Sequence, residues 1–186
     1  MHFPIPFKDK PRPQHEIWKD VEELYKQGLA KSIGVSNYTV ALLMTLLACA
    51  EVKPAANQVE LHPYLVQPEL VSYCQENGIA VVAYCPLGAA GRAEEGQKCL
   101  VQEPVILDIA KKHGKTPAQV LLQWNLARNV IVIPKTSSLE RLTENFNCTD
   151  FRLSKAEIEK INGLDCGRRV IDPSKIEFLY NIPYFK

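Results

Sequence analysis

Four short runs of β-branched and apolar residues alternate with helical patterns along this chain of 186 residues. The runs cover residues 30–35, 55–61, 79–83 and 129–133, and the first three begin at a spacing typical of a (β/α) barrel. Strands that alternate with helices form βαβ units, in which the strands pair in parallel. The alternation therefore predicts an α/β fold with a parallel sheet.

The predicted helices have recognisable ends. Pro68 stands where a helix can begin and Gly78 where that helix can end. Thr116–Gln119 has the spacing of a capping box, with a proline at the first helical position. The longest apolar run, residues 40–50, is predicted to be a buried helix. The helix over residues 16–27 is predicted to bury one face, made of Ile17, Trp18, Val21, Leu24 and Tyr25.

The stretch Ile133–Asn145, IPKTSSLERLTEN, begins at the end of the last apolar run and leads into a helix. Ser137 or Ser138 can cap this helix, and Ser137 with Glu140 also has the capping-box spacing. The first turn of a helix offers free N–H groups and the positive end of the helix dipole. A helix start in this position is therefore a candidate site for an anion.

Two cations flank that helix start. Lys135 leaves the strand as a point charge, and Arg141, one turn into the helix, carries a guanidinium that can hold two phosphate oxygens. The pattern predicts a phosphate site. The spacing alone leaves an alternative open, in which the segment is a strand-to-helix turn with two solvated cations.

Composition excludes several kinds of partner. The net charge of +1 and the absence of a basic stripe argue against nucleic acid and against an acidic membrane surface. No apolar run approaches the ~18 residues of a membrane span, and the N-terminal residues have no signal-peptide pattern. The six cysteines lack metal-site spacing and the four histidines are far apart, so we expect free thiols, no bound metal and a cytoplasmic location.

Four motifs in order make the chain resemble the second half of an aldo-keto reductase. They are GVSNY (34–38), NQVELHP (57–63), AYCPLG (83–88) and the stretch 133–145 described above. MHFPIPF (1–7) is similar to the end of that family's fourth strand. The family consists of (β/α)8 TIM-barrel enzymes that reduce aldehydes and ketones with a nicotinamide cofactor, usually NADPH. The resemblance implies that residues 1–186 are a single domain, the C-terminal portion of such a barrel (about strands 4–8), with residues 163–186 as the substrate loop.

The resemblance also assigns roles to individual residues. Ser36, Asn37 and Gln58 match the positions that bind the nicotinamide carboxamide, and Tyr84 matches the aromatic residue that stacks on the nicotinamide ring. The remaining matches are Leu87 for a backbone contact near the pyrophosphate, Lys135, Thr136 and Arg141 for the 2′-phosphate, Glu144 and Asn145 for the adenine, and His2 for the substrate carbonyl.

The chain departs from the family pattern in three places. Ala89, Ala90 and Gly91 stand where many members have a serine and then an aspartate that closes a loop over the cofactor, so we expect a looser clamp. The stretch 7–18 is shorter than the family's loop, which affects one wall of the substrate pocket. The family's proton-donating tyrosine and its lysine and aspartate partners have no match here, so we expect the isolated chain to be inactive.

Three interpretations follow from the resemblance and the departures. The favoured one is a fragment or short isoform of an NADPH-dependent aldehyde reductase that acts on a small carbonyl substrate and is monomeric when its barrel is complete. The second is a non-catalytic half-barrel that binds NADPH. The third, a phosphate-binding barrel of unrelated chemistry, is disfavoured by the paired motifs at 34–38 and 57–63.

Overall fold

The computed structural model describes residues 1–4, 12–89 and 99–171. The chain divides into two compact units. The first unit is Met1–Val59 with Pro68–Val81 and Ile171–Lys186, and the second is Glu60–Gln67 with Val82–Val170. The predicted positions Ala90 and Gly91, the stretch 7–11 and most of the predicted substrate loop lie outside the described residues. No described helix is long and apolar enough to cross a membrane.

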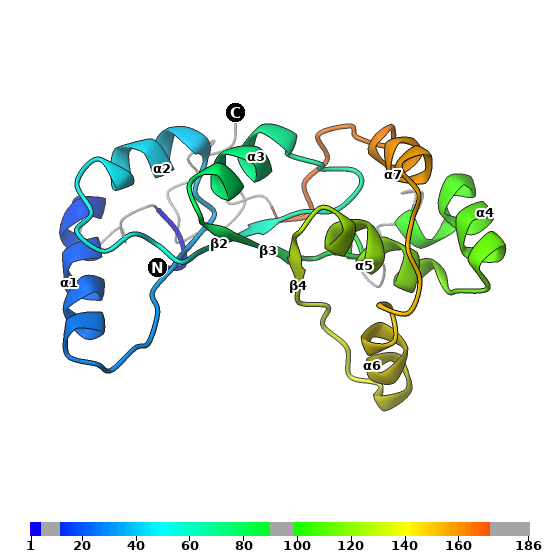
Figure 1. Ribbon diagram of the computed structural model, residues 1–186, viewed down its shortest axis with the longest axis horizontal. Coiled ribbons are helices and arrows are strands. Elements are labelled where there is room, and N and C mark those ends of the chain that lie inside the picture. The colour runs from blue at the N-terminus through cyan, green and yellow to red at the C-terminus, as the bar shows by residue number, and fades with distance from the viewer. Residues whose placement is uncertain (5–11, 90–98, 172–186) are drawn as a thin grey trace. The chain divides into compact units, whose positions relative to one another are not determined.

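The first unit alternates helices and strands (Figure 1). Its elements are α1 (Gln14–Lys26), β1 (Val35–Ser36), α2 (Val40–Leu47), β2 (Ala56–Glu60, whose last residue belongs to the second unit) and α3 (Pro68–Glu76). Strands β1 and β2 pair in parallel, with Val35 opposite Asn57 and Ser36 opposite Gln58. Helices α2 and α3 contact one another and lie side by side in Figure 1. This is the βαβ arrangement that the alternation of the sequence predicts.

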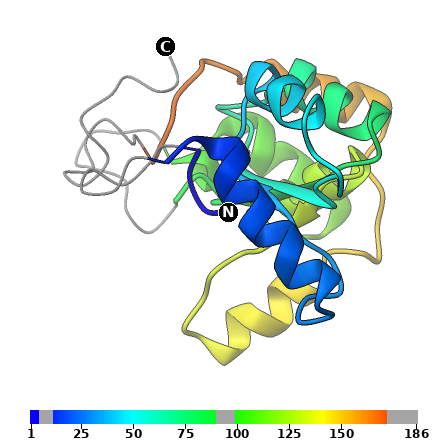
Figure 2. The same ribbon diagram turned by 90° about the vertical axis from the view of Figure 1, so that its left-hand side faces the viewer.

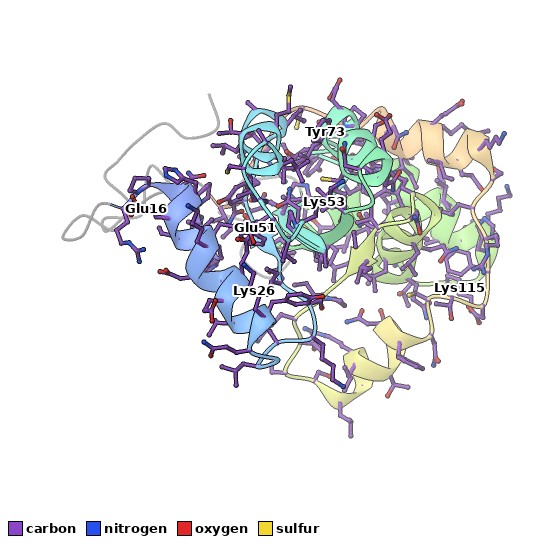
Figure 3. The ribbon with its side chains drawn as sticks, turned by 60° about the vertical axis from the view of Figure 1, so that its left-hand side comes forward. Glu16, Lys26, Glu51, Lys53, Tyr73 and Lys115 are labelled. Carbon is purple, nitrogen blue, oxygen red and sulfur yellow. The ribbon has the colours of Figure 1, made fainter. Side chains whose placement is uncertain are left out.

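Helix α1 packs through one aromatic and one carboxylate side chain. Trp18 is buried, and its Nε1 donates to the carbonyl of Val52 at 3.1 Å. Glu22 is also buried, and its Oε1 accepts from the backbone N–H groups of Glu51 and Val52 at 2.8 and 2.9 Å. Lys26, in the last turn, pairs with the Glu51 carboxylate at 2.7 Å (Figure 3). The helix is therefore fastened to the turn that precedes β2.

Two predictions of burial in the first unit are wrong. Leu24 and Tyr25 of α1 are 47% and 41% exposed, because the face of α1 that packs is centred on Trp18 and Glu22. Helix α2 is fully buried only at Leu43 and Leu46, while Met44 is 57% exposed and the other leucines of the helix are half-buried. A continuous apolar run therefore does not make a buried helix here, since only one side of α2 meets the rest of the unit.

The second unit continues the pattern (Figure 2). Its elements are β3 (Ala80–Tyr84, which begins in the first unit), the 3-10 helix η1 (Leu100–Gln102), α4 (Pro104–His113), α5 (Pro117–Ala127), β4 (Ile131–Val132), α6 (Leu139–Phe146) and α7 (Lys155–Asn162). Strands β3 and β4 pair in parallel, with Val82 opposite Ile131 and Ala83 opposite Val132. Helix α5 is the most deeply packed element, since Val120, Leu121, Leu122 and Trp124 are fully buried.

The predicted helix ends of the second unit are confirmed at α5. Thr116 Oγ1 accepts from the N–H of Gln119 at 3.2 Å, and Gln119 Oε1 accepts from the N–H of Thr116 at 3.1 Å, so both bonds of the capping box form. The strand predictions are right in place, but the first and the last of them are too long. The first run, 30–35, contributes only Val35 to a ladder, and the last run contributes only Ile131 and Val132.

Candidate functional site

Ser36 and Asn37, at the carboxyl end of β1, meet Gln58 in the middle of β2. Ser36 Oγ donates to the Gln58 carbonyl at 2.7 Å, and the Asn37 N–H donates to the same carbonyl at 2.9 Å. Asn37 has φ +64°, a left-handed conformation that asparagine tolerates better than most residues. This conformation turns the chain out of β1 immediately after the strand, so the polar end of β1 is held against β2.

His2 reaches the same place through its backbone. Asn37 Nδ2 donates to the His2 carbonyl at 3.0 Å and to Ser36 Oγ at 3.2 Å. The His2 side chain is exposed, and the centres of the His2 and Phe3 rings are 4.6 Å apart. Within the described part of the chain the Gln58 side-chain amide has no hydrogen-bond partner, so its donors and acceptor remain available to a ligand.

A buried asparagine supports this arrangement from beneath. Asn57 is fully buried, its Oδ1 accepts from the N–H of Tyr38 at 3.3 Å, and its Nδ2 donates to the carbonyl of Tyr38 at 3.0 Å. The two bonds tie the chain that follows β1 to β2. Asn57 begins the motif NQVELHP, but no role was predicted for it. An amide side chain inside a strand is a signal for hydrogen bonds of this kind between neighbouring segments.

Tyr84 ends β3 in the second unit and is half-buried. Burial raises the pKa of its phenol far above the ordinary value, and the Glu60 carboxylate raises this pKa further, while Arg169 lowers it in part. The phenol is therefore neutral at physiological pH. A neutral, half-buried aromatic ring is suited to stacking on a flat ligand.

A tight turn follows Tyr84. Cys85, Gly88 and Ala89 have φ values of +49°, +61° and +53°, and the N–H of Gly88 donates to the Cys85 carbonyl at 2.8 Å. A Cβ atom on Gly88 would lie 2.5 Å from Leu100 Cδ1, so a side chain at this position would collide with the core. Leu87, the predicted backbone contact, lies within this turn.

The predicted phosphate segment follows β4. Ser138 is the N-cap of α6, and its Oγ accepts from the N–H of Arg141 at 3.3 Å. Thr136 Oγ1 accepts from the N–H of Ser138 at 3.1 Å, which fixes the turn before the helix. The predicted cap at Ser138 is confirmed. The capping box of Ser137 with Glu140 is wrong, because Ser138 is the last residue with extended backbone before the helix.

Lys135 and Arg141 are both exposed. Within the described residues neither cation forms an ion pair with a carboxylate. Their charges add to the positive end of the α6 dipole and to its first N–H groups. Cations that are left unpaired by the protein itself are what a site for a phosphate requires, and the residues present therefore fit such a group.

Glu144 and Asn145 lie on α6 in the last turns. Glu144 Oε1 accepts from Thr116 Oγ1 at 2.7 Å, and the Glu144 carbonyl accepts from Gln119 Nε2 at 3.0 Å. Asn145 is buried. The capping box of α5 thus anchors α6, and the Glu144 side chain has a structural bond in addition to its predicted contact with adenine, which stays a prediction.

Sequence reasoning missed two buried residues, one at the end of β2 and one just after it. Glu60 and His62 are both fully buried, and Glu60 Oε1 lies 2.9 Å from His62 Nε2. Both belong to the motif NQVELHP (57–63), but no role was predicted for either. An ionisable pair of alternating residues at the end of a strand is the signal that could have drawn attention to them.

Comparison with known proteins defines the class of this chain. The family model described as "Aldo/keto reductase family" matches residues 1–165, and the chain belongs to that family. It is 47% identical over 170 residues to a probable NAD(P)H-dependent D-xylose reductase of Aspergillus clavatus, a match that covers 88% of this chain and 52% of the relative. It is 40% identical to aldo-keto reductase family 1 member A1 of Rattus norvegicus, over 93% of this chain and 58% of that protein.

Solved structures agree with these relatives. An aldo-keto reductase of Bombyx mori in complex with NADP matches with a TM-score of 0.88 and 34% identity, over 98% of this chain and 62% of that one. The aldose reductase of Schistosoma japonicum matches with a TM-score of 0.84 and 36% identity, over 95% of this chain and 55% of that one. The chain thus spans about half the length of the curated relatives it matches.

Proposed function

We propose that this chain forms the cofactor-binding portion of an NADPH-dependent aldo-keto reductase that reduces small aldehydes or ketones to alcohols. The observation that carries the proposal is the pair of exposed cations at the capped start of α6, Lys135 and Arg141, which form no ion pair with any other described residue. The names of the relatives support it, since they include NAD(P)H-dependent reductases and a reductase solved with NADP.

Each predicted site residue has a task in this reaction. The nicotinamide cofactor supplies hydride to the carbonyl carbon of the substrate. Ser36, Asn37 and Gln58 would bind the carboxamide of the nicotinamide and so orient the ring, and Tyr84 would stack on it. Lys135, Thr136 and Arg141 would hold the 2′-phosphate, the Leu87 backbone would contact the pyrophosphate, and Glu144 and Asn145 would contact the adenine.

Reduction of a carbonyl also needs a proton for the developing alkoxide. General acid help of this kind is typically worth ~10²–10⁴ in rate. His2 orients the carbonyl in this proposal, with its backbone held by Asn37. We propose that the donor is the family's tyrosine, supplied by the half of the family barrel that these 186 residues do not span. The working enzyme is then a monomeric cytoplasmic protein, in keeping with six free cysteines.

Reconstitution tests this proposal. Residues 1–186 alone, and the same chain co-expressed with a polypeptide that supplies the first three βα units of a relative, are assayed with NADPH and a nitrobenzaldehyde. We expect negligible turnover by the lone chain and NADPH-dependent turnover by the pair. The matched variant replaces the tyrosine of the added polypeptide by phenylalanine, and we expect it to abolish turnover while NADPH still binds.

Two results would contradict the proposal. Turnover by the lone, monomeric chain at the rate of an intact relative would place the proton donor within these residues, and Tyr84→Phe would then be the first variant to examine. A reconstituted protein that binds NADPH but never turns over would instead support the second interpretation, a non-catalytic NADPH-binding half-barrel.

A further inference from the structure

The backbone of residues 166–170 docks on the loop that follows β2. The carbonyl of Tyr64 accepts from the N–H groups of Cys166 and Arg168, at 3.3 and 3.0 Å. Two residues further on, the N–H of Val170 donates a hydrogen bond to Glu60 Oε1 at 2.5 Å. Three alternate N–H groups of the segment are therefore held, two of them by the single Tyr64 carbonyl and the third by the Glu60 carboxylate.

Two arginine side chains of the same segment add to the attachment. The Arg168 guanidinium lies 4.0 Å above the centre of the Tyr64 ring. Arg169 Nη2 donates to Gln67 Oε1 at 3.2 Å, and Gln67 Nε2 donates to the Glu60 carbonyl at 2.6 Å. We call residues 166–170, with these contacts, the docked segment.

Glu60 is held in turn by His62. The same Oε1 that accepts from Val170 lies 2.9 Å from His62 Nε2, and both side chains are 0% exposed. The His62 ring meets the Tyr64 ring edge-on, with centroids 6.5 Å apart. A fully buried carboxylate costs free energy unless hydrogen bonds compensate it, and here the histidine and the Val170 N–H supply them.

The docked segment lies beside the residue that is proposed to stack on the nicotinamide. The N–H of Leu61, adjacent to Glu60, donates to the Tyr84 carbonyl at 3.3 Å. The charges of Glu60 and Arg169 both act on the Tyr84 phenol. Glu60 therefore connects β3 at Tyr84 with residues 166–170, which belong to the described part of the predicted substrate loop.

We propose that Glu60, held by His62, is a positioning residue that latches the docked segment and so sets which substrates the enzyme accepts. This rests on the proposed function, because the substrate loop acts only in a working reductase. If Glu60 had only a structural role, it would stabilise the fold, and its loss would not change which substrates the enzyme accepts. Hydrogen exchange and kinetics together distinguish the two roles.

Hydrogen exchange measures the latch without any assay of activity. We compare amide exchange of the peptide that contains Arg168 and Val170 in the full chain, in Glu60→Gln and Glu60→Ala, with Glu69→Ala of α3, an exposed carboxylate, as the control. A hydrogen bond to a charged group protects its donor, so we expect exchange at Val170 to rise on the order of tenfold in Glu60→Ala, less in Glu60→Gln, and not in the control. Unchanged exchange in both Glu60 variants would overturn the latch.

Kinetics of the reconstituted enzyme measure the consequence. For a series of aldehydes of increasing size, we expect Glu60→Ala to change KM for the large members several-fold and to leave kcat for the smallest member and the affinity for NADPH unchanged. Equal effects on every substrate would overturn the role in selectivity. If Glu60→Ala does not fold, Glu60→Gln, which keeps the shape of the side chain and removes its charge, decides the matter by the same two readouts. Wild-type protein that exchanges as expected but shows no turnover would refute the proposed function, and with it the selectivity role, while the latch would stand.

Discussion

Replacing Glu157 with glutamine is expected to destabilise the second unit by about 2 kcal/mol, the order of a hydrogen bond to a charged group. The Glu157 side chain, at the start of α7, is only 8% exposed. Its Oε1 accepts from Lys112 Nζ at 2.7 Å and from His113 Nε2 at 3.0 Å, both at the end of α4. Its Oε2 accepts from the N–H and the hydroxyl of Ser154, each at 2.8 Å, which completes the capping box of α7.

The magnitude follows from what glutamine retains. Its carboxamide oxygen can still accept on one side, either from Ser154 or from the α4 cations. Its NH₂ group then faces donors on the other side and loses those bonds. A hydrogen bond to a charged group is worth ~1.5–3 kcal/mol, and the loss of a helix cap ~1 kcal/mol, so about 2 kcal/mol is the expected net loss.

The same carboxylate predicts a pH dependence. Burial alone would raise the pKa of Glu157, but the hydrogen bonds from Lys112, Ser154 and His113 lower it from 4.5 to about 2. A group whose pKa is lower in the folded state stabilises the protein above its unfolded pKa. The contribution of Glu157 is thus complete above pH 4.5 and is lost as the pH falls from 4.5 to about 2.

Urea unfolding followed by circular dichroism at about pH 7 and about pH 3 tests both statements. The three proteins are the wild type, Glu157→Gln and Glu159→Gln, an exposed carboxylate on the same helix. We expect the difference between wild type and Glu157→Gln to shrink at the lower pH, and Glu159→Gln to match the wild type. A Glu157→Gln protein as stable as the wild type at pH 7, or one with the same acid sensitivity, would refute the reasoning.

Two further predictions concern the site and the surface. A Cβ on residue 34 would lie 2.9 Å from the Ala56 carbonyl oxygen, so Gly34→Ala should force β1 away from β2 and weaken NADPH binding. Quenching of protein fluorescence measures this affinity. An unaltered affinity would show that the strands tolerate the shift. Leu139, Leu142 and Phe146 of α6 are 79%, 54% and 84% exposed, so Leu139→Gln with Phe146→Ser should reduce self-association of the lone chain in sedimentation experiments. If self-association persists, another surface is responsible.

Local signals account for the parts of the fold that the sequence predicts well. The capping box at Thr116 and the helix start at Pro68 depend on residues within one turn, and both occur where predicted. The alternation of apolar runs with helical patterns likewise predicts the parallel strand pairs. The family motifs predict where cofactor residues stand, and the structure brings three of these residues, Ser36, Asn37 and Gln58, together. Their role in cofactor binding stays a prediction.

Contacts between distant residues account for what the sequence does not predict. The exposure of Leu24 depends on which neighbours α1 finds, and no periodicity within the helix contains that information. Glu60 binds the backbone of Val170, 110 positions away, so neither residue alone indicates the bond. The lengths of β1 and β4 depend in the same way on how many residues the partner strand can pair, rather than on the apolar run itself.

Arg152 offers a matched control for the phosphate-binding role of Arg141. It is exposed and in the same unit, but its guanidinium is bound by the carbonyls of Thr149 and Phe151. Arg152→Ala therefore removes the same charge from the unit without touching the start of α6.

The dissociation constants of NADPH and NADH for the reconstituted protein, with Arg141→Ala and Arg152→Ala, test the central claim most directly. A charge-assisted bond to phosphate is worth ~1.5–3 kcal/mol, so we expect NADPH to bind at least about tenfold more tightly than NADH. Arg141→Ala should remove most of that preference by weakening NADPH alone, and Arg152→Ala should leave it intact. Equal affinities for the two cofactors, or a ratio unchanged by Arg141→Ala, would contradict the assignment of the α6 start as the 2′-phosphate site.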